Sequence, residues 1–561
     1  MVKNQIIHLE TNMTNNAIVQ KLWNLCDVLR DDGINYSDYV TELVLLLFIK
    51  MVHENTKKEV FNRHPLPESC RWTDLRGKSG INLLNDYKAI LLALSTGKRT
   101  VVIKAEKAGE KDKVEEVVVH EDPLIRAIYA DAQTRLREPR HLEQMIKTLD
   151  QIDWFSAQKD GLGDLYEGLL EKNASETKSG AGQYFTPRAL INSMVRCIKP
   201  QIGEVIQDPA AGTAGFLVAA DQYMRAQTDD YLELSAKDAK FQKNKAFVGV
   251  ELVPNTRRLA LMNCLLHGME GDEEGVVHLG NALGDAGKDL KQADIILANP
   301  PFGTSKGGEA SNTRDDLTYK TTNKQLAFLQ HIYRNLKPGG RAAVVLPDNV
   351  LFEAGVGTEV RRDLMNKCNL HTILRLPTGI FYAQGVKTNV LFFTKGSAKD
   401  KHQEENCTEN VWVYDLRTNM PSFGKRTPFG NADIGFAQEE FGKDPHLGAF
   451  EQVFGESSDG TSKRTEGEYS FDAQDIEVDK EVVEENQGIN DHLAHSRWRS
   501  FSREWIRDKK VDSLDISWLK DKDSVDVADL PVPDVLAREA KGELHAALIE
   551  LDNLLAALEA N

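Results

Sequence analysis

A rigid polar corner follows an apolar run in the middle of the chain. Residues 293–298 predict a buried strand, and Asn299, Pro300, Pro301 and Phe302 come directly after it. The prolines restrict the backbone, so an amide and a peptide carbonyl point in set directions beside an aromatic ring. The Asn299 side-chain oxygen and the Pro300 carbonyl could accept both N–H bonds of a nucleobase amine and free its lone pair, while Phe302 stacks on the base. The alternative is a simple turn that ends a strand.

Polar residues also end three earlier predicted strands. Residues 205–217 give a strand, Asp208, a Gly-rich turn and the start of a helix, which is typical of the nucleotide-binding turn of a doubly wound α/β sheet. The next strand, 246–250, runs into Glu251, a carboxylate placed to accept two ribose hydroxyls. A third strand, 276–280, is followed by Asn281. These groups are expected at the carboxyl edge of the sheet, where such sheets bind ligands.

These motifs carry a family resemblance. Residues 180–188 (Gly-Ala-Gly-Gln-Tyr-Phe-Thr-Pro-Arg), 208–216 and 299–303 together resemble the N6-adenine DNA methyltransferases that use S-adenosylmethionine. The chain looks in particular like the modification subunit of type I restriction-modification systems, and the resemblance continues through 372–381 and 415–419. It implies an α/β fold with a Rossmann-like, doubly wound, seven-stranded methyltransferase sheet, a helical N-terminal domain and a helical C-terminal extension.

The resemblance also implies a set of site residues. Asn299, Pro300, Pro301 and Phe302 would be catalytic. The cofactor-binding residues would be Gln183, Tyr184, Phe185, Thr186, Pro187, Arg188, Asp208, Gly212, Thr213, Ala214, Gly215, Glu251 and Asn281. Many of these enzymes carry an acid at the position of Asn281. His267 ends a predicted helix and is expected to be a helix-terminal cation.

The composition is that of a globular chain whose charge opposes DNA binding. The net charge of −17 repels a polyanion, so the chain alone is expected to bind duplex DNA weakly. The six cysteines are scattered without metal-ligand spacing, which favours reduced, structural thiols and no metal site. The early apolar run 43–49 is too short to span a bilayer and no leader precedes it, which favours a cytoplasmic protein.

The 561 residues predict three regions. Residues 1–155 are expected to form the helical N-terminal domain, with a β-hairpin insertion around residues 101–119. Residues 156–475 are expected to form the methyltransferase domain, in which the turn 382–387 could line the base pocket. Residues 476–561 are expected to be a helical, partner-binding region.

Two segments of the last region are ambiguous. Residues 497–507 interleave cations and aromatics, which favours an amphipathic helix with buried aromatics over a surface that binds phosphates and bases. Leucines 544, 548, 551, 555 and 558 have heptad spacing and suit a partner helix or this chain's own core. Resemblance to the family favours a partner, the specificity subunit.

The sequence therefore predicts transfer of the S-adenosylmethionine methyl group to N6 of an adenine flipped out of duplex DNA. No phosphate-binding Gly-x-x-x-x-Gly-Lys loop is present, so ATP-driven steps are assigned to a separate restriction subunit. The resemblance implies two of these chains per specificity subunit. The alternatives are methylation of a protein glutamine amide, or a cofactor-binding scaffold without turnover.

Overall fold

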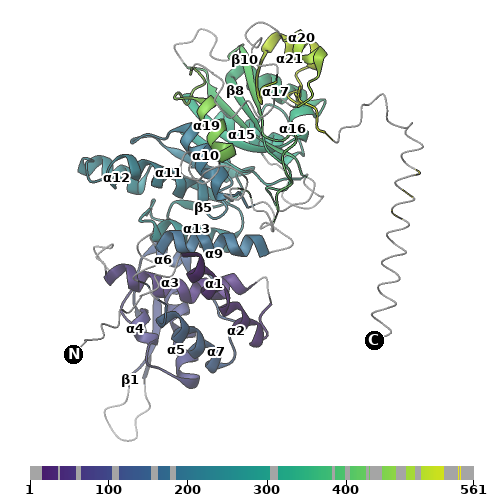
Figure 1. Ribbon diagram of the computed structural model, residues 1–561. Helices are drawn as coiled ribbons and strands as arrows, with labels where there is room; N and C mark the ends of the chain where they lie inside the picture. The colour runs from purple at the N-terminus through teal and green to yellow at the C-terminus, as the bar shows by residue number, and fades with distance from the viewer. Residues whose placement is uncertain are drawn as a thin grey trace, which may run out of the picture.

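The computed structural model divides into a helical end and a sheet end, with helices α9 and α13 between them (Figure 1). It describes residues 15–35, 38–57, 65–103, 113–152, 154, 162–176, 185–303, 314–381, 386–397, 405–424, 429, 445–462, 476–486, 495–522, 538, 541 and 544. Within these ranges, no helix has the combination of length and apolar character that crossing a membrane requires.

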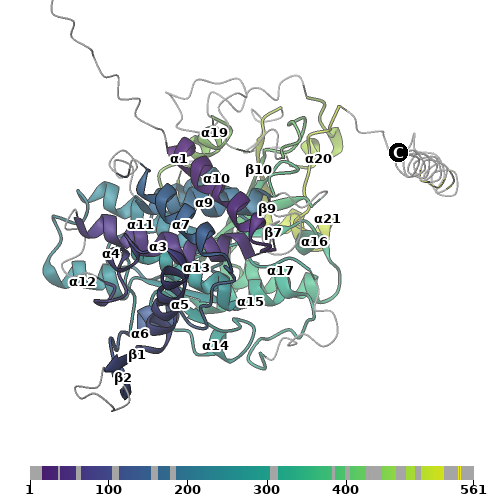
Figure 2. The same cartoon turned by 90° about the horizontal axis from the view of Figure 1, so that it is seen from below.

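The N-terminal domain is helical, as predicted. Its helices are α1 (Asn15–Trp23), α2 (Leu25–Asp31), α3 (Tyr39–Lys57), α4 (Trp72–Leu75), α5 (Gly80–Thr96), α6 (Pro123–Ile128) and α7 (Pro139–Asp150). Helices α1 and α2 meet at Asn24. The predicted hairpin is confirmed, because β1 (Lys98–Ile103) pairs antiparallel with β2 (Lys113–Val118) and projects from the domain in both views (Figure 1 and Figure 2).

Helices α9 (Leu162–Glu176) and α13 (Pro254–Leu266) join the two ends of the molecule. The buried guanidinium of Arg258 in α13 donates to the carbonyl oxygens of Ile128 and Ala130, at the end of α6. Tyr166 of α9 is fully buried in the same core. The helical domain is therefore packed against the layer that supports the sheet.

One sheet of nine strands forms the other end, in the order β11-β10-β8-β9-β7-β6-β3-β4-β5. Its strands are β3 (Ile206–Asp208), β4 (Phe247–Glu251), β5 (Val277–Leu279), β6 (Ala293–Ala298), β7 (Leu336–Pro347), β8 (Cys368–Arg375), β9 (Thr388–Lys395), β10 (Asn410–Asp415) and β11 (Trp498–Ser502). Strands β3 to β9 are the seven expected, with β9 antiparallel to β7 and β8. Strands β10 and β11 extend the sheet beyond the expected seven.

Helices cover both faces of the sheet, which makes it doubly wound. Side chains of alternate strand residues point to opposite faces. Ile295 and Leu297 lie in the core formed with α10 and α11, whereas Ile296 and Ala298 lie in the core formed with α15 and α17. The helices of this domain are α10 (Arg188–Ile198), α11 (Gly215–Gln227), α12 (Ala236–Asn244), α14 (Asp285–Lys288), α15 (Lys324–Asn335), α16 (Asn349–Phe352), α17 (Val356–Lys367), α19 (Pro445–Phe454), α20 (Lys480–Glu485) and α21 (Arg503–Lys510).

The segment 497–507 corrects two predictions. It is not one amphipathic helix but strand β11 followed by α21, and β11 pairs antiparallel with β10. The methyltransferase sheet therefore extends past residue 475, where the predicted domain ends, because its edge strand comes from residues 498–502. Burial of the aromatics is confirmed, since Trp498 and Phe501 are fully buried, and Arg499 donates to the carbonyls of Val483 and Asn486.

All six cysteines are free thiols, and five of them are buried, as expected for structural residues. Of the leucines with heptad spacing, only Leu544 belongs to the described residues, and it is exposed. The predicted leucine seam thus lies outside the part of the chain that the structure describes.

Candidate active site

The polar groups predicted at the strand ends gather at one edge of the sheet. Strands β6, β3, β4 and β5 are adjacent and parallel, so Asn299, Asp208, Glu251 and Asn281 follow neighbouring carboxyl ends. The chain runs outward from β3 to β4 and β5, and then returns to β6 on the other side of β3. Doubly wound sheets bind their ligands at such a reversal of strand order, outside the carboxyl ends of the strands.

The Gly-rich turn after β3 is tied to Glu251. One Glu251 oxygen accepts from the Gly212 N–H at 3.0 Å, and the other accepts from the Val253 N–H at 2.8 Å. Ala214, with φ 67°, is the N-cap of α11. Gly212 has φ +54° and faces open space, with no atom within 4 Å of where a Cβ would be. The turn therefore leaves room for a ligand directly above its backbone.

Asp208 lies beneath the turn and is almost completely buried. One of its carboxylate oxygens accepts from the Ala210 N–H at 3.0 Å. Burial raises the pKa of Asp208 to about 8, and the nearby charge of Glu251 adds to the effect. Burial also raises the pKa of Glu251. Two carboxyls that are costly to ionise would be stabilised in their charged forms by a ligand with a cation or hydroxyl donors.

An apolar patch borders Glu251 and was not predicted from the sequence. Leu252, Val253 and Leu279 are 62%, 45% and 49% exposed at the ends of β4 and β5. The nearby Asn281 oxygen accepts from the Leu283 N–H at 2.9 Å. Exposed apolar side chains beside a carboxylate suit an aromatic base attached to a ribose. The sequence does carry a signal for this patch, because two apolar residues, Leu252 and Val253, directly follow Glu251 at the end of the strand.

The predicted corner after β6 contacts the loop before α10. Asn299 Nδ2 donates to Thr186 Oγ1 at 2.9 Å, although 113 residues separate them, and Thr186 is buried. The Phe302 ring is half-buried and meets the Phe381 ring edge to face, with centroids 6.0 Å apart. The Pro301 carbonyl accepts from Gln325 at 3.5 Å. Pro187 is the N-cap of α10 and Phe185 is half-buried, whereas Gln183 and Tyr184 lie outside the described residues.

Arg188 is bound to protein groups rather than directed at open space. Its guanidinium pairs with Glu167 of α9 at 2.5 Å and donates to Gln222 of α11 at 2.7 Å. Glu167 also accepts from Asn263 Nδ2 at 3.2 Å, and the same amide nitrogen is 2.9 Å from the Thr213 carbonyl. Arg188 therefore takes part in a polar network that supports the Gly-rich turn from below.

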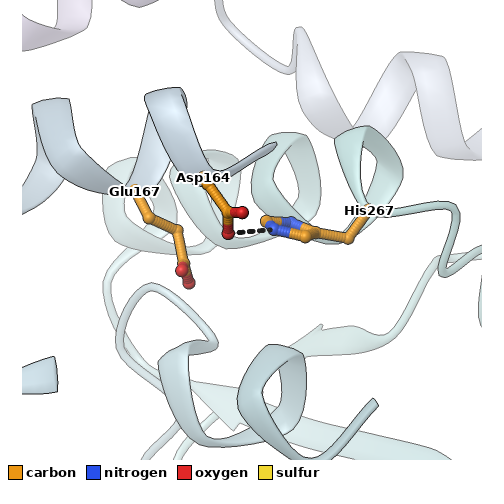
Figure 3. A group of neighbouring side chains, drawn as sticks. All are labelled: Asp164, Glu167 and His267. Carbon is orange, nitrogen blue, oxygen red and sulfur yellow. Dashed lines mark ion pairs between the residues drawn. The ribbon is translucent and has the colours of Figure 1, made fainter. Parts of the chain in front are cut away.

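A cluster of metal-ligand types belongs to this network. Candidate ligand atoms of Asp164, Glu167 and His267 all lie within 4.8 Å of one another (Figure 3). His267 follows α13 and lies 3.6 Å from Asp164, so its predicted place at the end of a helix is confirmed. Burial acts to lower the pKa of His267, but Asp164, Glu167 and the Asn263 carbonyl together raise it. Glu167 is already paired with the Arg188 guanidinium, and the raised pKa of His267 favours a ring proton, which competes with a metal for the imidazole nitrogen.

A doubly wound sheet whose central strand runs into Asn-Pro-Pro-Phe defines a methyltransferase that acts on exocyclic amino groups. Comparison with known proteins identifies the family within this class. Residues 157–499 match the N-6 DNA Methylase family, residues 18–149 match the HsdM N-terminal domain, and residues 530–561 match the C-terminal domain of type I restriction enzyme methylase subunits. The chain belongs to the methylase subunits of type I restriction enzymes, a family of N6-adenine DNA methyltransferases.

Individual relatives cover nearly the whole chain. The EcoKI methylase subunit of Escherichia coli (strain K12) is 53% identical over 98% of this chain and 96% of its own length. The StySPI methylase subunit of Salmonella potsdam is 53% identical with the same coverage. The crystal structure of the EcoKI M protein is 49% identical over 96% of each chain, with a TM-score of 0.56. The family and enzyme class predicted from the sequence are therefore confirmed.

Proposed function

We propose that the chain transfers the methyl group of S-adenosylmethionine to N6 of an adenine flipped out of duplex DNA, with Asn299 as the residue that orients the amine. The observation that carries this proposal is the bond from Asn299 Nδ2 to Thr186 Oγ1. Because this bond fixes the orientation of the Asn299 amide group, its oxygen points the other way and can accept hydrogen bonds. Thr186 thus acts as a positioning residue for the corner.

The corner prepares the adenine amine for attack. The lone pair of that nitrogen is delocalised into the ring, so the amine is a weak nucleophile. The Asn299 oxygen and the Pro300 carbonyl accept its two N–H bonds and return electron density to the nitrogen. The Phe302 ring, braced edge to face by Phe381, stacks on the base and fixes its plane. No covalent enzyme intermediate is needed, and the motif supplies no thiol for one.

The strand-end crevice fits S-adenosylmethionine. The cofactor supplies a methyl group activated on a positive sulfur. Glu251 would accept the ribose hydroxyls, and the apolar patch of Leu252, Val253 and Leu279 would hold the adenine ring. The buried Asp208 would support the Gly-rich turn through the Ala210 N–H. Open space at Gly212 lets the cofactor approach the backbone closely. Phe185, Thr186 and Pro187, with Gln183 and Tyr184, would border the methionine end, while Arg188 would support the Gly-rich turn from below.

A specificity subunit would supply what this chain lacks. The net charge of −17 opposes DNA binding by the chain alone, and a basic partner would overcome it. The family match over residues 530–561, together with the heptad leucines in that segment, supports this segment as the contact with the specificity subunit. We place two copies of the chain on each specificity subunit, with restriction subunits completing the assembly in the cytoplasm.

The test is transfer of labelled methyl groups to duplex DNA by the full chain, alone and with its specificity subunit. Asn299→Ala should abolish formation of N6-methyladenine while the chain still binds S-adenosylmethionine. Glu251→Gln should instead weaken cofactor binding by about 10- to 100-fold, because charge-assisted hydrogen bonds contribute about 1.5–3 kcal/mol. Unaltered methylation by Asn299→Ala would disprove the assigned role, and equal cofactor loss in both variants would show that the two sites are not separable.

A further inference from the structure

Arg417 lies just after β10 and closes the base of a neighbouring loop. Its Nε donates to the Leu376 carbonyl at 3.0 Å, and its Nη2 donates to the Thr388 carbonyl at 2.8 Å. Leu376 directly follows β8 and Thr388 begins β9, so these two carbonyls stand at the two ends of the connecting segment. The Leu376 N–H also donates to the Thr388 carbonyl at 3.0 Å, so one buried guanidinium braces two loop ends that the backbone already joins.

Asp348 holds the guanidinium in place. Its two oxygens accept from Arg417 Nη1 at 2.8 Å and Nη2 at 2.9 Å, which is the bidentate geometry of a strong ion pair. Asn389 Nδ2 donates to the same carboxylate at 2.8 Å, and the Asp348 N–H donates to the Lys387 carbonyl. Burial acts to raise the pKa of Asp348, but Arg417 and Asn389 lower it below its ordinary value. The carboxylate therefore stays charged at neutral pH.

The loop 376–388 carries an aromatic ring of the candidate active site. Phe381 is 1% exposed and meets Phe302 at a 74° interplanar angle. On its other side the loop is tied by the Phe423 N–H, which donates to the Thr378 carbonyl at 3.0 Å. Gly379, with φ +81°, packs so closely on the Phe423 carbonyl that a Cβ there would overlap it. The position of Phe381 is therefore restrained by hydrogen bonds at Leu376 and Thr388 and by the contacts of Thr378 and Gly379 with Phe423.

We propose that Arg417 is a positioning residue for the target base, which acts by holding Phe381 against Phe302. This inference rests on the proposed function, because Phe302 is assigned to stack on the flipped adenine. Arg417 itself touches neither base nor cofactor. Without Arg417, the backbone bond from the Leu376 N–H to the Thr388 carbonyl still joins the loop ends, but both carbonyls and Asp348 lose their shared donor. The Phe381 edge then shifts, and the base occupies the orientation for in-line transfer less often.

Arg417→Lys is the direct test, because lysine keeps the charge beside Asp348 but one ammonium cannot replace the planar fork that spans both carbonyls. Arg361→Lys is the matched control. Arg361 is also a buried guanidinium that donates to three backbone carbonyls, those of Val350, Glu353 and Asp512, but none belongs to the loop 376–388. The full chain with its specificity subunit should show kcat about 10- to 100-fold lower for Arg417→Lys only. Melting temperature and S-adenosylmethionine affinity should match those of the control.

A double-mutant cycle separates positioning from general damage. If Arg417 acts through Phe381, then Phe381→Leu should lower kcat similarly, and the combined variant should lose little more than either single variant. The fluorescence of 2-aminopurine at the target position should report equal flipping but altered stacking in both. Fully additive losses, or the same kcat loss in Arg361→Lys, would overturn the proposal. Absence of methylation by the wild-type complex would instead overturn the proposed function.

Discussion

At the scale of single residues, Asp208 is an acid that the fold buries without a cation. Its pKa of about 8 means that the folded chain holds a proton there which the unfolded chain has released above about pH 4. Between these two values the unfolded state binds fewer protons, so the free energy of unfolding falls as pH rises and the loss is complete above pH 8. The cofactor-free chain is therefore destabilised at neutral pH by one carboxyl.

Asp208→Asn should remove this penalty. The amide oxygen can still accept from the Ala210 N–H, and the variant has no charge to bury. We expect a higher melting temperature than wild type, with a gap that opens above about pH 5, reaches its maximum near pH 8 and corresponds to a few kcal/mol. Melting curves of the cofactor-free chain from pH 5 to 9 provide the measurement.

Asp415→Asn is the control for Asp208→Asn, because Asp415 is also fully buried but shifted in the opposite direction. Burial acts to raise its pKa, but Arg375, the N–H groups of Arg417 and Thr418, and Arg497 lower it below the ordinary value. A lowered pKa contributes stability above the unfolded pKa that is lost as pH falls. The Asn variant should therefore melt at a lower temperature than wild type at pH 7. Parallel shifts in the two variants would contradict the assigned burial effects.

Residue identity at the strand ends could be read from the sequence, but the contacts of those residues could not. Asp208, Glu251 and Asn299 each follow a short apolar run, and this pattern was sufficient to place them at one sheet edge. The bond between Asn299 and Thr186 joins residues 113 positions apart, and the ion pair of Arg417 with Asp348 joins residues 69 positions apart. Local sequence patterns do not encode contacts over such separations. Arg188 was expected at the cofactor, but its partners Glu167 and Gln222 come from two other helices.

At the scale of elements, the packing of α9 on α13 depends on a glycine. Gly163 lies in the first turn of α9, and a Cβ there would overlap the His267 imidazole that follows α13. Gly163→Ala should push the ring away from Asp164 and destabilise the chain by about 1–3 kcal/mol, the usual cost of overpacking. The shift in melting temperature measures it.

Gly424→Ala is the matched comparison for Gly163→Ala, because Gly424 has no atom within 4 Å of a Cβ and no positive φ. It should leave the melting temperature close to that of wild type. Equal stability of both alanine variants would show that the imidazole moves at no cost. In that case the ion pair shown in Figure 3 would not contribute to the α9–α13 packing.

The element that the sequence predicted least well is β11. Helical periodicity relies on one buried face, whereas Trp498, Arg499, Ser500 and Phe501 are all buried. A strand covered on both faces shows no alternation, so its pattern resembles that of a buried helix. The strands of the central sheet were predicted correctly because each is a short apolar run that a polar or glycine-rich turn ends.

At the scale of the whole molecule, the catalytic sheet and the proposed partner contact occupy different parts of the chain. Among the described residues β11 is the last strand of the sheet, and the residues through 522 pack on it, since the Lys520 N–H donates to the Glu477 carbonyl and Trp518 is fully buried. The family match to the C-terminal domain begins later, at residue 530. A chain that ends after Lys522 should therefore keep its fold and its affinity for S-adenosylmethionine.

The truncated chain should nevertheless fail to methylate duplex DNA with the specificity subunit, because it lacks the proposed contact segment and its remaining excess of acidic residues still opposes approach to the phosphates. Paired substitutions give a finer test. Leu551→Glu with Leu555→Glu places charges on the leucine seam, whereas Asn553→Glu adds a charge between seam positions. Only the seam variant should lose co-purification with the specificity subunit and, with it, methylation. Retained methylation by the truncated chain would move the contact surface onto residues before 523.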